Sequence, residues 1–285
     1  MDAETDEETD APTRRRYAAS TSPKSAAPPR QGEVKIHPTA LVDARAELGE
    51  GVEVGAFAIV EAGARLGRGT RLLAHAIVHG TASLGEGNVV HPFAVLGAPP
   101  QAKRPSTALD APARTEIGDH NVIREHVTIH GGTDGRVTRI GSHNLLMVGA
   151  HVAHDVSLGS HCVIANAVQL AGHAIVHDYA TFGGLSGVAQ FVEIGESAFV
   201  AAGSMCERAV PPFVIVQGDR ARVRALNVVG LRRRGVPEES IAKLTRAFRM
   251  LFAREATRAE ALRELECAPW AAGDPYVATL VAALR

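Results

Sequence analysis

Residues 48–72 read LGEGVEVGAFAIVEAGARLGRGTRL, and an aliphatic residue recurs in this stretch at every sixth position. The same series extends over 36–96, and the spacing holds again over 117–129 and 140–200. A period of six matches neither the 3.6-residue period of an α-helix nor the alternation of a long strand. Hexapeptide repeats are typical of a parallel β-helix, in which a short strand and a turn form each side of a triangular coil. The sequence therefore predicts an all-β left-handed parallel β-helix whose periodic side chains fill the prism.

The regular spacing is interrupted twice. Residues 97–116 are rich in Pro and Ala, and residues 131–136 are a shorter Gly-rich stretch. An insertion into a solenoid leaves the prism as a loop, and such loops often line a binding surface. We therefore expect the larger insertion, 97–116, to contribute to a functional site.

The segments that flank the repeat have a different character. Residues 1–33 contain almost no large apolar side chains, so we expect a disordered N-terminal tail. The β-helix domain is predicted over 34–220. Residues 221–285 are predicted to form a small C-terminal α-helical domain, with helices over about 236–254, 257–266 and 274–284. The first of these places Ile241, Leu244, Phe248 and Leu251 on one apolar face.

The composition excludes several classes of protein. A formal net charge of −1 provides no basic excess for binding nucleic acid. No apolar run approaches the roughly 20 residues that span a bilayer, and no signal peptide is recognisable. Cys162, Cys206 and Cys267 match no disulfide or metal spacing, so we expect buried thiols in a reducing compartment. These features predict a cytoplasmic protein without stable membrane insertion.

Histidines gather in one part of the repeat, and His151, His154 and Asp155 lie within five residues of one another. His173 follows almost one coil later, so it should lie beside His154. A carboxylate next to an imidazole holds one tautomer and stabilises the protonated ring, as a general base requires. Two other interpretations are exposed turn histidines without a role and a zinc site, because neutral histidine is a common metal ligand.

A second candidate site is the basic segment Arg232–Arg234, which Asn227 precedes by a few residues. Arginine binds phosphate through two parallel hydrogen bonds, so a cluster near a helix start can hold a phosphate group. The alternative interpretation is a solvated run of charge.

Six stretches together resemble the UDP-N-acetylglucosamine O-acyltransferases, which begin lipid A biosynthesis in Gram-negative bacteria. The resemblance covers about 34–285, and its most specific stretch is 141–155. The matching stretches are IHPTA (36–40), REHVTIHGGT (124–133), GSHNLLMVGAHVAHD (141–155), LAGHAIV (170–176), VPPFVIVQGD (210–219) and GLRRRG (230–235).

The resemblance implies a reaction and a set of residues. An acyl carrier protein would supply an (R)-3-hydroxyacyl group to the 3-hydroxyl of UDP-N-acetylglucosamine, without a cofactor or metal, in a homotrimer with sites between neighbouring prisms. It implies His154 as general base, Asp155 as its orienting partner and the Gly172 N–H as oxyanion donor. The residues that it implies in binding the UDP-sugar are Gln101, His130, His151, His173, Gln190, Asn227, Arg233 and Arg234.

Two departures from the family pattern concern the sugar. The family motif Gln-Asp-Leu-Lys is replaced here by Gln101-Ala102-Lys103-Arg104, and a family His is replaced by Ala189. The acceptor can therefore be a related nucleotide sugar, including one with a 3-amino group. A small residue at Ala202 predicts an open acyl groove and a longer chain, of roughly fourteen carbons by family analogy. The remaining alternatives are a zinc enzyme of the gamma-class carbonic anhydrase kind and a scaffold without activity.

Overall fold

The computed structural model describes residues 32–101, 113–253 and 256–285. The chain divides into two compact units, Met1–Gln31 and Gly32–Arg285, and every described residue belongs to the second. Most of the predicted tail 1–33 and of the predicted insertion 97–116 therefore lie outside the described residues.

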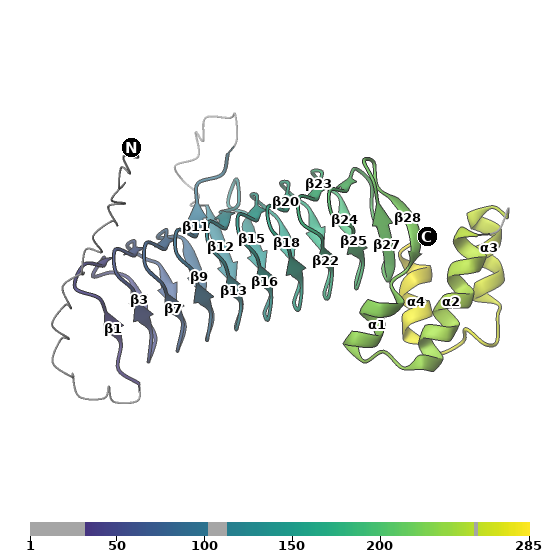
Figure 1. Cartoon of the computed structure of the whole chain (residues 1–285), viewed down its shortest axis with the longest axis horizontal. Coiled ribbons are helices and arrows are strands. Elements are labelled where there is room, and N and C mark those ends of the chain that lie inside the picture. The colour runs from purple at the N-terminus through teal and green to yellow at the C-terminus, as the bar shows by residue number, and fades with distance from the viewer. Residues whose placement is uncertain (1–31, 102–112, 254–255) are drawn as a thin grey trace, which may run out of the picture. The chain divides into compact units, whose positions relative to one another are not determined.

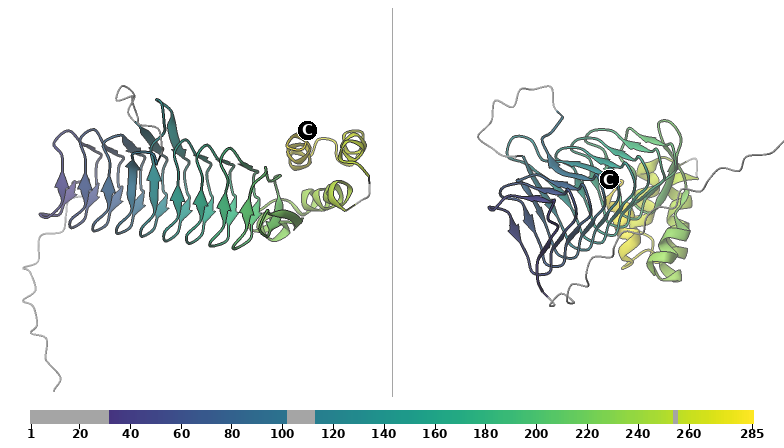
Figure 2. Two further views of the ribbon diagram at one scale, coloured as in Figure 1. Left: turned by 90° about the horizontal axis from the view of Figure 1, so that it is seen from above. Right: turned by 60° about the vertical axis from the view of Figure 1, so that its left-hand side comes forward.

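Short parallel strands stack along one axis and form three sheets, one for each side of a left-handed β-helix (Figures 1 and 2). The first sheet contains β1 (Lys35–Ile36), β4 (Glu53–Val54), β7 (Arg71–Leu72), β10 (Val89–Val90), β13 (Val122–Ile123), β16 (Leu145–Leu146), β19 (Val163–Ile164), β22 (Thr181–Phe182), β25 (Phe199–Val200), β27 (Val214–Gln217) and β28 (Arg222–Leu226). The second contains β2 (Leu41–Val42), β5 (Ile59–Val60), β8 (Ile77–Val78), β11 (Val95–Ala98), β14 (Thr128–His130), β17 (His151–Val152), β20 (Gln169–Leu170), β23 (Gly187–Val188) and β26 (Met205–Cys206). The third contains β3 (Glu47–Leu48), β6 (Arg65–Leu66), β9 (Ala82–Leu84), β12 (Arg114–Ile117), β15 (Val137–Ile140), β18 (Ser157–Leu158), β21 (Ile175–Val176) and β24 (Glu193–Ile194). The predicted fold class is confirmed.

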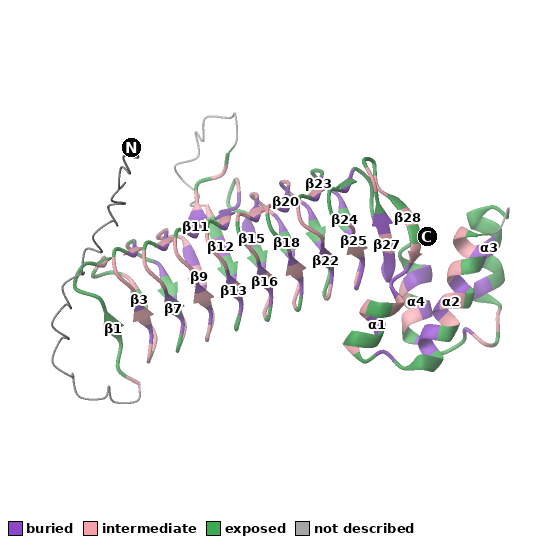
Figure 3. Cartoon of the chain, in the orientation of Figure 1, coloured by how far each residue is buried: buried purple, intermediate pink, exposed green. Residues whose placement is uncertain are grey.

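The periodic side chains fill the prism as predicted, except at its first coil. Every sixth-position residue from Val54 to Val200 is buried, and Figure 3 shows this buried interior running along the coils. Ile36, by contrast, is 46% exposed, because it lies on β1 in the first coil and no preceding coil covers it. Neighbouring coils thus supply each other's apolar contacts, as in other solenoids.

A ladder of buried amides runs inside one corner of the prism, which the six-residue pattern did not predict. Asn121 Nδ2 donates to Asn88 Oδ1 at 3.0 Å, and Asn121 Oδ1 accepts the Asn144 N–H at 2.9 Å. Asn144 Oδ1 in turn accepts the Cys162 N–H at 2.7 Å. Each amide thereby satisfies corner N–H groups that would otherwise be buried without a partner.

The two interruptions fall between strands of the prism. Strand β11 extends to Ala98 and β12 begins at Arg114, so both ends of the predicted loop 97–116 are strand. These ends pair with neighbouring coils, and that pairing overrides their Pro- and Ala-rich surroundings. The shorter interruption, 131–136, lies between β14 and β15 as expected.

The C-terminal part contains the helices α1 (Val228–Arg234), α2 (Glu238–Phe252), α3 (Arg258–Glu266) and α4 (Pro275–Ala282). The last three lie within a few residues of their predicted bounds. The prediction that the helical region begins at residue 221 was wrong, because β28 pairs antiparallel with β27 and tertiary pairing overrides local preference. Helix α1 was also missed, and the basic segment therefore lies in its last turn rather than at a helix start.

A second apolar cluster holds these helices together. It includes Leu231 of α1, Leu244 of α2 and Leu280 of α4, and it also takes in Phe213, which precedes β27. Of the three thiols, Cys162 and Cys206 are buried as expected, and burial raises their pKa values to about 12 and about 11. Cys267 is exposed, contrary to expectation, because it caps the end of α3. Within the described ranges, no helix has the length and apolar character needed to cross a membrane.

Candidate active site

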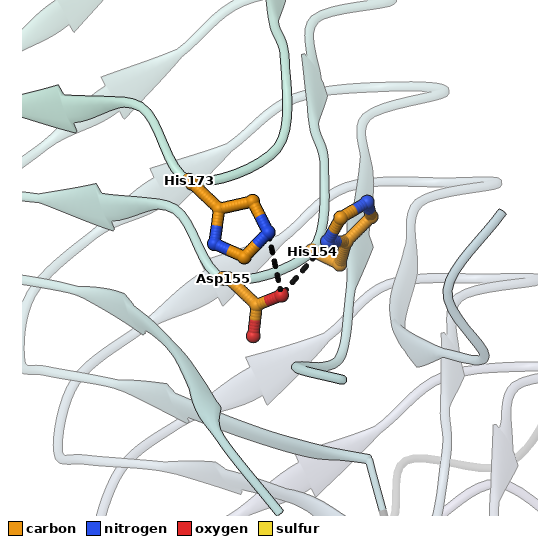
Figure 4. A group of neighbouring side chains, drawn as sticks. All are labelled: His154, Asp155 and His173. Atoms are coloured by element: carbon orange, nitrogen blue, oxygen red, sulfur yellow. Dashed lines mark hydrogen bonds and ion pairs between the residues drawn. The ribbon is translucent and has the colours of Figure 1, made fainter. Parts of the chain in front are cut away.

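His154 and Asp155 lie in the turn that follows β17, and their side chains face each other. His154 Nδ1 is 2.8 Å from Asp155 Oδ2 (Figure 4). An ionised carboxylate only accepts hydrogen bonds, so the imidazole proton lies on Nδ1 and Nε2 is the basic nitrogen. Asp155 has a φ of 62°, and this left-handed corner conformation lets the carboxylate turn back toward the preceding residue. The pair therefore has the arrangement of a general base and its orienting acid.

Asp155 is almost fully enclosed, with 3% of its side chain exposed. Its Oδ1 accepts the Thr133 N–H at 2.9 Å, and its Oδ2 accepts the Thr133 hydroxyl at 2.6 Å. Burial by itself raises the pKa of this carboxyl, but the hydrogen bonds from Thr133 and His154 outweigh burial and leave the pKa below its usual value. Asp155 is therefore ionised at neutral pH and available to hold His154.

His173 lies one coil along from His154, as the spacing predicted. Its Nε2 is 3.4 Å from the same Oδ2 of Asp155, and Figure 4 shows both rings directed at that atom. The His154 and His173 rings meet edge to face with centroids 5.2 Å apart. On its other side His173 stacks on Phe191 at 4.5 Å. Two histidines thus surround one carboxylate oxygen.

His130 and His151 form a second pair on the neighbouring strands β14 and β17. Their rings meet edge to face at 4.8 Å, and His151 Nδ1 is 2.7 Å from Thr128 Oγ1. Burial lowers the pKa of His130 to about 4 and also lowers the pKa of His151. His130 Nδ1 is buried without a hydrogen-bond partner among the described residues. Both rings are therefore neutral at pH 7, and they can hydrogen-bond a substrate without adding charge.

Gly172 lies directly against the imidazole of His154. A Cβ atom at this position would be 2.6 Å from His154 Cε1, which is closer than atoms can approach without a shift. The glycine is itself buried. Only a residue without a side chain permits this approach of backbone to ring.

An open hollow of about 380 Å³ adjoins Asp155 and His173. Arg114, Arg136 and Arg139 also line it, and Arg139 pairs with Glu116 at 3.2 Å. Cationic side chains at this hollow suit an anionic substrate group. A larger hollow of about 530 Å³ lies at α3 and α4. Its lining includes no histidine, so it offers no comparable base.

Asn227 and Arg234 already have partners within the chain. The Asn227 side chain caps α1 by accepting the Gly230 N–H at 3.0 Å, and it also donates to the Ser197 carbonyl at 2.9 Å. Arg234 forms an ion pair with Glu196, and its guanidinium lies 4.0 Å from the centre of the Tyr179 ring. Both residues therefore join α1 to the β-helix, a structural role that the sequence did not indicate.

Tyr179 is itself the end of a ring stack along one edge of the prism. His120, His143, His161 and Tyr179 stack with centroids 4.8–5.2 Å apart on successive coils. The stack leads to Arg234, whose guanidinium lies over the Tyr179 ring.

Three predicted binding residues are exposed at the surface of the chain. Gln190 and Arg233 are exposed, and Gln101 is exposed at the edge of the segment 102–112, which lies outside the described residues. None of the three forms a hydrogen bond or ion pair with His154 among the described residues. The histidines therefore contact one another within one chain, whereas these three side chains remain exposed.

The ligand atoms of His154, Asp155 and His173 lie within 4.8 Å of one another, a spacing that can hold a metal ion. Zinc in carbonic anhydrases has three histidine ligands, whereas one of the three groups here is a carboxylate. The Asp155 oxygens already accept hydrogen bonds from Thr133 and His154. The cluster therefore fits a hydrogen-bonded base better than the zinc alternative.

Comparisons with known proteins all indicate one family. The family profile described as "Udp N-acetylglucosamine O-acyltransferase; Domain 2" matches residues 210–285. Two proteins named acyl-[acyl-carrier-protein]–UDP-N-acetylglucosamine O-acyltransferase are close in sequence. That of Alkalilimnicola ehrlichii is 53% identical over 81% of this chain and 89% of its own. That of Thiobacillus denitrificans is 48% identical over 86% of this chain and 94% of its own.

Solved structures of this kind superpose on most of the chain. The UDP-N-acetylglucosamine O-acyltransferase of Moraxella catarrhalis has a TM-score of 0.81 at 36% identity, over 87% of this chain and 96% of its own. The Arabidopsis UDP-N-acetylglucosamine acyltransferase has a TM-score of 0.76 at 32% identity, over 87% of this chain and 95% of its own. From its sequence, its left-handed β-helix and these relatives, the chain belongs to the UDP-N-acetylglucosamine O-acyltransferase family.

Proposed function

We propose that this protein transfers an (R)-3-hydroxyacyl group from acyl carrier protein to the 3-hydroxyl of UDP-N-acetylglucosamine. Relatives that are up to 53% identical over most of the chain are named for an acyl carrier protein and this acceptor. The observation that supports the proposal is the His154–Asp155 pair, in which Asp155 engages Nδ1 and leaves Nε2 to act as the base that such a transfer needs.

The reaction follows from the protonation state of this pair. His154 Nε2 accepts the proton of the sugar hydroxyl while the oxygen attacks the thioester carbonyl carbon. The carbonyl oxygen becomes an oxyanion, to which the Gly172 N–H donates a hydrogen bond. When the tetrahedral intermediate collapses, the C–S bond breaks and the proton on Nε2 passes to the thiolate of the carrier. Asp155 holds Nδ1–H throughout and stabilises the imidazolium that forms in between.

The residues around the pair have roles that suit a UDP-sugar. Neutral His130 and His151, together with His173, hydrogen-bond the sugar beside the base. Gln101 and Gln190 provide further polar contacts, and the exposed Arg233 binds a phosphate of the nucleotide. Asn227 and Arg234 lie close to the UDP-sugar and hold α1 in place against the β-helix.

The exposed position of Gln190, Arg233 and Gln101 on one chain supports a site that two chains complete. We therefore infer a homotrimer with three sites between neighbouring prisms. The mass of the protein measured by light scattering tests this inference. A monomer at enzyme concentrations that support turnover would contradict it.

Ala189 favours a second acceptor as the alternative. It is exposed and carries no polar side chain where the family has histidine. A related nucleotide sugar, including one with a 3-amino group, is therefore the runner-up substrate. The exposed Ala202 is consistent with an open groove for a longer acyl chain.

The decisive experiment incubates the protein with UDP-N-acetylglucosamine, or its 3-amino analogue, and a series of hydroxyacyl carrier proteins of different lengths. We expect acylated UDP-N-acetylglucosamine from the wild type and none from His154→Ala. His177→Ala is the matched control, because His177 pairs with Glu193 at 2.6 Å and not with the Asp178 that follows it. Product only from the 3-amino sugar would establish the alternative acceptor, and undiminished turnover by His154→Ala would reject the base.

A further inference from the structure

We propose that Thr133 is a positioning residue for catalysis, which acts by holding the Asp155 carboxylate in the orientation that fixes the His154 base. This inference rests on the proposed function. It also gives a role to the second interruption of the repeat, 131–136, which contains Thr133 and contributes no other residue to the proposed reaction.

The contacts of Thr133 cover both oxygens of one carboxylate. Its backbone N–H donates to Asp155 Oδ1 at 2.9 Å, and its hydroxyl donates to Asp155 Oδ2 at 2.6 Å. Oδ2 is the same atom that lies 2.8 Å from His154 Nδ1. Two donors from one residue at both ends of the carboxylate prevent it from rotating, so Oδ2 stays directed at the imidazole.

The backbone of Asp155 is held by a different threonine. Thr138 Oγ1 accepts the Asp155 N–H at 2.8 Å, and Thr138 is completely buried at the start of β15. Thr133 lies in the turn 131–136, and Thr138 lies in the strand β15 that follows this turn. The turn therefore holds the side chain of Asp155, and the strand after it holds the main chain.

The sequence of the turn explains how Thr133 reaches this place. A Cβ on Gly131 would be 2.6 Å from the Ala113 carbonyl oxygen, and a Cβ on Gly132 would be 2.4 Å from the Arg136 carbonyl oxygen. The two glycines thus let the chain pass between backbone segments that exclude any side chain. The Arg136 N–H then donates to the Thr133 carbonyl at 2.8 Å and closes the turn.

Positioning of this kind affects the rate more than binding. Thr133 and the imidazole of His154 both hydrogen-bond Asp155 Oδ2, so Thr133 acts on the reacting atoms through Asp155. Thr133→Ala keeps the N–H but loses the hydroxyl, so Oδ2 can turn away from Nδ1. We expect kcat to fall roughly 10-fold, with KM for both substrates changed less than about 3-fold. The acid limb of the kcat profile should move to lower pH, because a carboxylate turned away stabilises the imidazolium less.

The test uses three variants and one control. Thr133→Ser restores the hydroxyl and should recover kcat to within about 3-fold of the wild type, whereas Thr133→Val, of similar shape, should resemble Thr133→Ala. Thr70→Ala is the matched control. Its hydroxyl donates to the Gly85 carbonyl at 2.9 Å in another part of the prism, so it should lose stability but not turnover.

A double-mutant cycle asks whether Thr133 acts through Asp155. In the Asp155→Asn background, Thr133→Ala should lower kcat by less than about 2-fold further. A full 10-fold loss in that background, or a Thr133→Ala variant that turns over as fast as the wild type, would overturn the proposal.

One measurement does not depend on turnover. We expect the Nδ1–H proton of His154, which bonds a carboxylate, to resonate downfield and to be absent in His154→Ala. This resonance should shift upfield or disappear in the NMR spectrum of Thr133→Ala and persist in Thr133→Ser and Thr70→Ala. A resonance unchanged in Thr133→Ala would reject the positioning role even if the acceptor sugar proves to be a different one.

Discussion

The imidazole of His154 rests so closely on Gly172 that a methyl group on that glycine would be 2.6 Å from Cε1. Gly172 lies one coil beyond His154, and its backbone therefore limits where the imidazole can lie. If a side chain filled this space, the imidazole could not keep its hydrogen bond to Asp155.

Gly172→Ala tests this relationship. The added methyl must displace the ring by several tenths of an ångström or more, so we expect kcat to fall at least about 10-fold while the fold is retained. Steady-state kinetics and a thermal melt provide the measurements. Gly203→Ala is a suitable control, because no atom lies within 4 Å of its added Cβ although its φ is 67°. It should cost about 1 kcal/mol of stability and leave turnover intact. Equal activity of the two variants would contradict the prediction.

Asp155→Asn should change the tautomer of His154, the proposed base. An amide nitrogen at this position can donate to Nδ1, which moves the imidazole proton to Nε2 and removes the acceptor of the sugar proton. We expect kcat to fall at least about 100-fold with little change in KM. Asp178→Asn is the control, because Asp178 also follows a histidine but accepts the Ser160 N–H at 2.8 Å. A similar loss in both variants would show that the effect is on folding.

His130 makes stability depend on pH. Burial lowers its pKa in the folded state to about 4, below its value of 6.5 in an unfolded chain. The folded state therefore binds fewer protons, so stability is complete above pH 6.5 and falls as the pH drops toward 4. The free energy of unfolding should decrease by about 3 kcal/mol across this interval relative to His130→Asn. Urea titrations at several pH values measure it, and parallel curves for the two proteins would contradict it.

Arg234 is predicted to stabilise the junction between α1 and the β-helix. Its guanidinium covers Tyr179 at 4.0 Å, donates to Ser197 Oγ at 2.9 Å and pairs with Glu196. Arg234→Ala should lower the free energy of unfolding by about 1–3 kcal/mol. Denaturant unfolding measures the loss, and the exposed neighbour Arg233→Ala should leave stability unchanged. Equal stability of the two variants would argue against a structural role for Arg234.

The amide ladder gives a prediction for the β-helix alone. Asn121→Ala removes the donor to Asn88 Oδ1 and leaves the buried Asn144 N–H without its acceptor. We expect a loss of about 2–4 kcal/mol in the free energy of unfolding, since buried unsatisfied groups are costly. A thermal or denaturant melt checks this, and a loss below about 0.5 kcal/mol would show that water replaces the amide.

Much of the architecture could be read from residues alone, because each coil of a β-helix contacts only its neighbours. The side chain at every sixth position is buried whenever a coil lies on each side of its own coil. This is why Val54 and Val200 were placed correctly and Ile36, which has no coil before it, was not. Strand β28 was missed for a different reason, because it pairs antiparallel with β27 and lies outside the six-residue period.

The candidate site shows what could not be predicted from the sequence. A histidine followed by an aspartate occurs at 154–155 and again at 177–178, and the two pairs are alike as sequence. Only the fold distinguishes them. Thr133, on another coil, donates to Asp155 and holds it beside His154. Asp178 instead accepts the Ser160 N–H, and His177 pairs with Glu193. The repeat by itself determined the prism and the zone in which histidines gather. Which histidine pairs with its neighbouring carboxylate was decided by tertiary contacts, since a hydrogen bond between distant turns leaves no periodic mark in the chain.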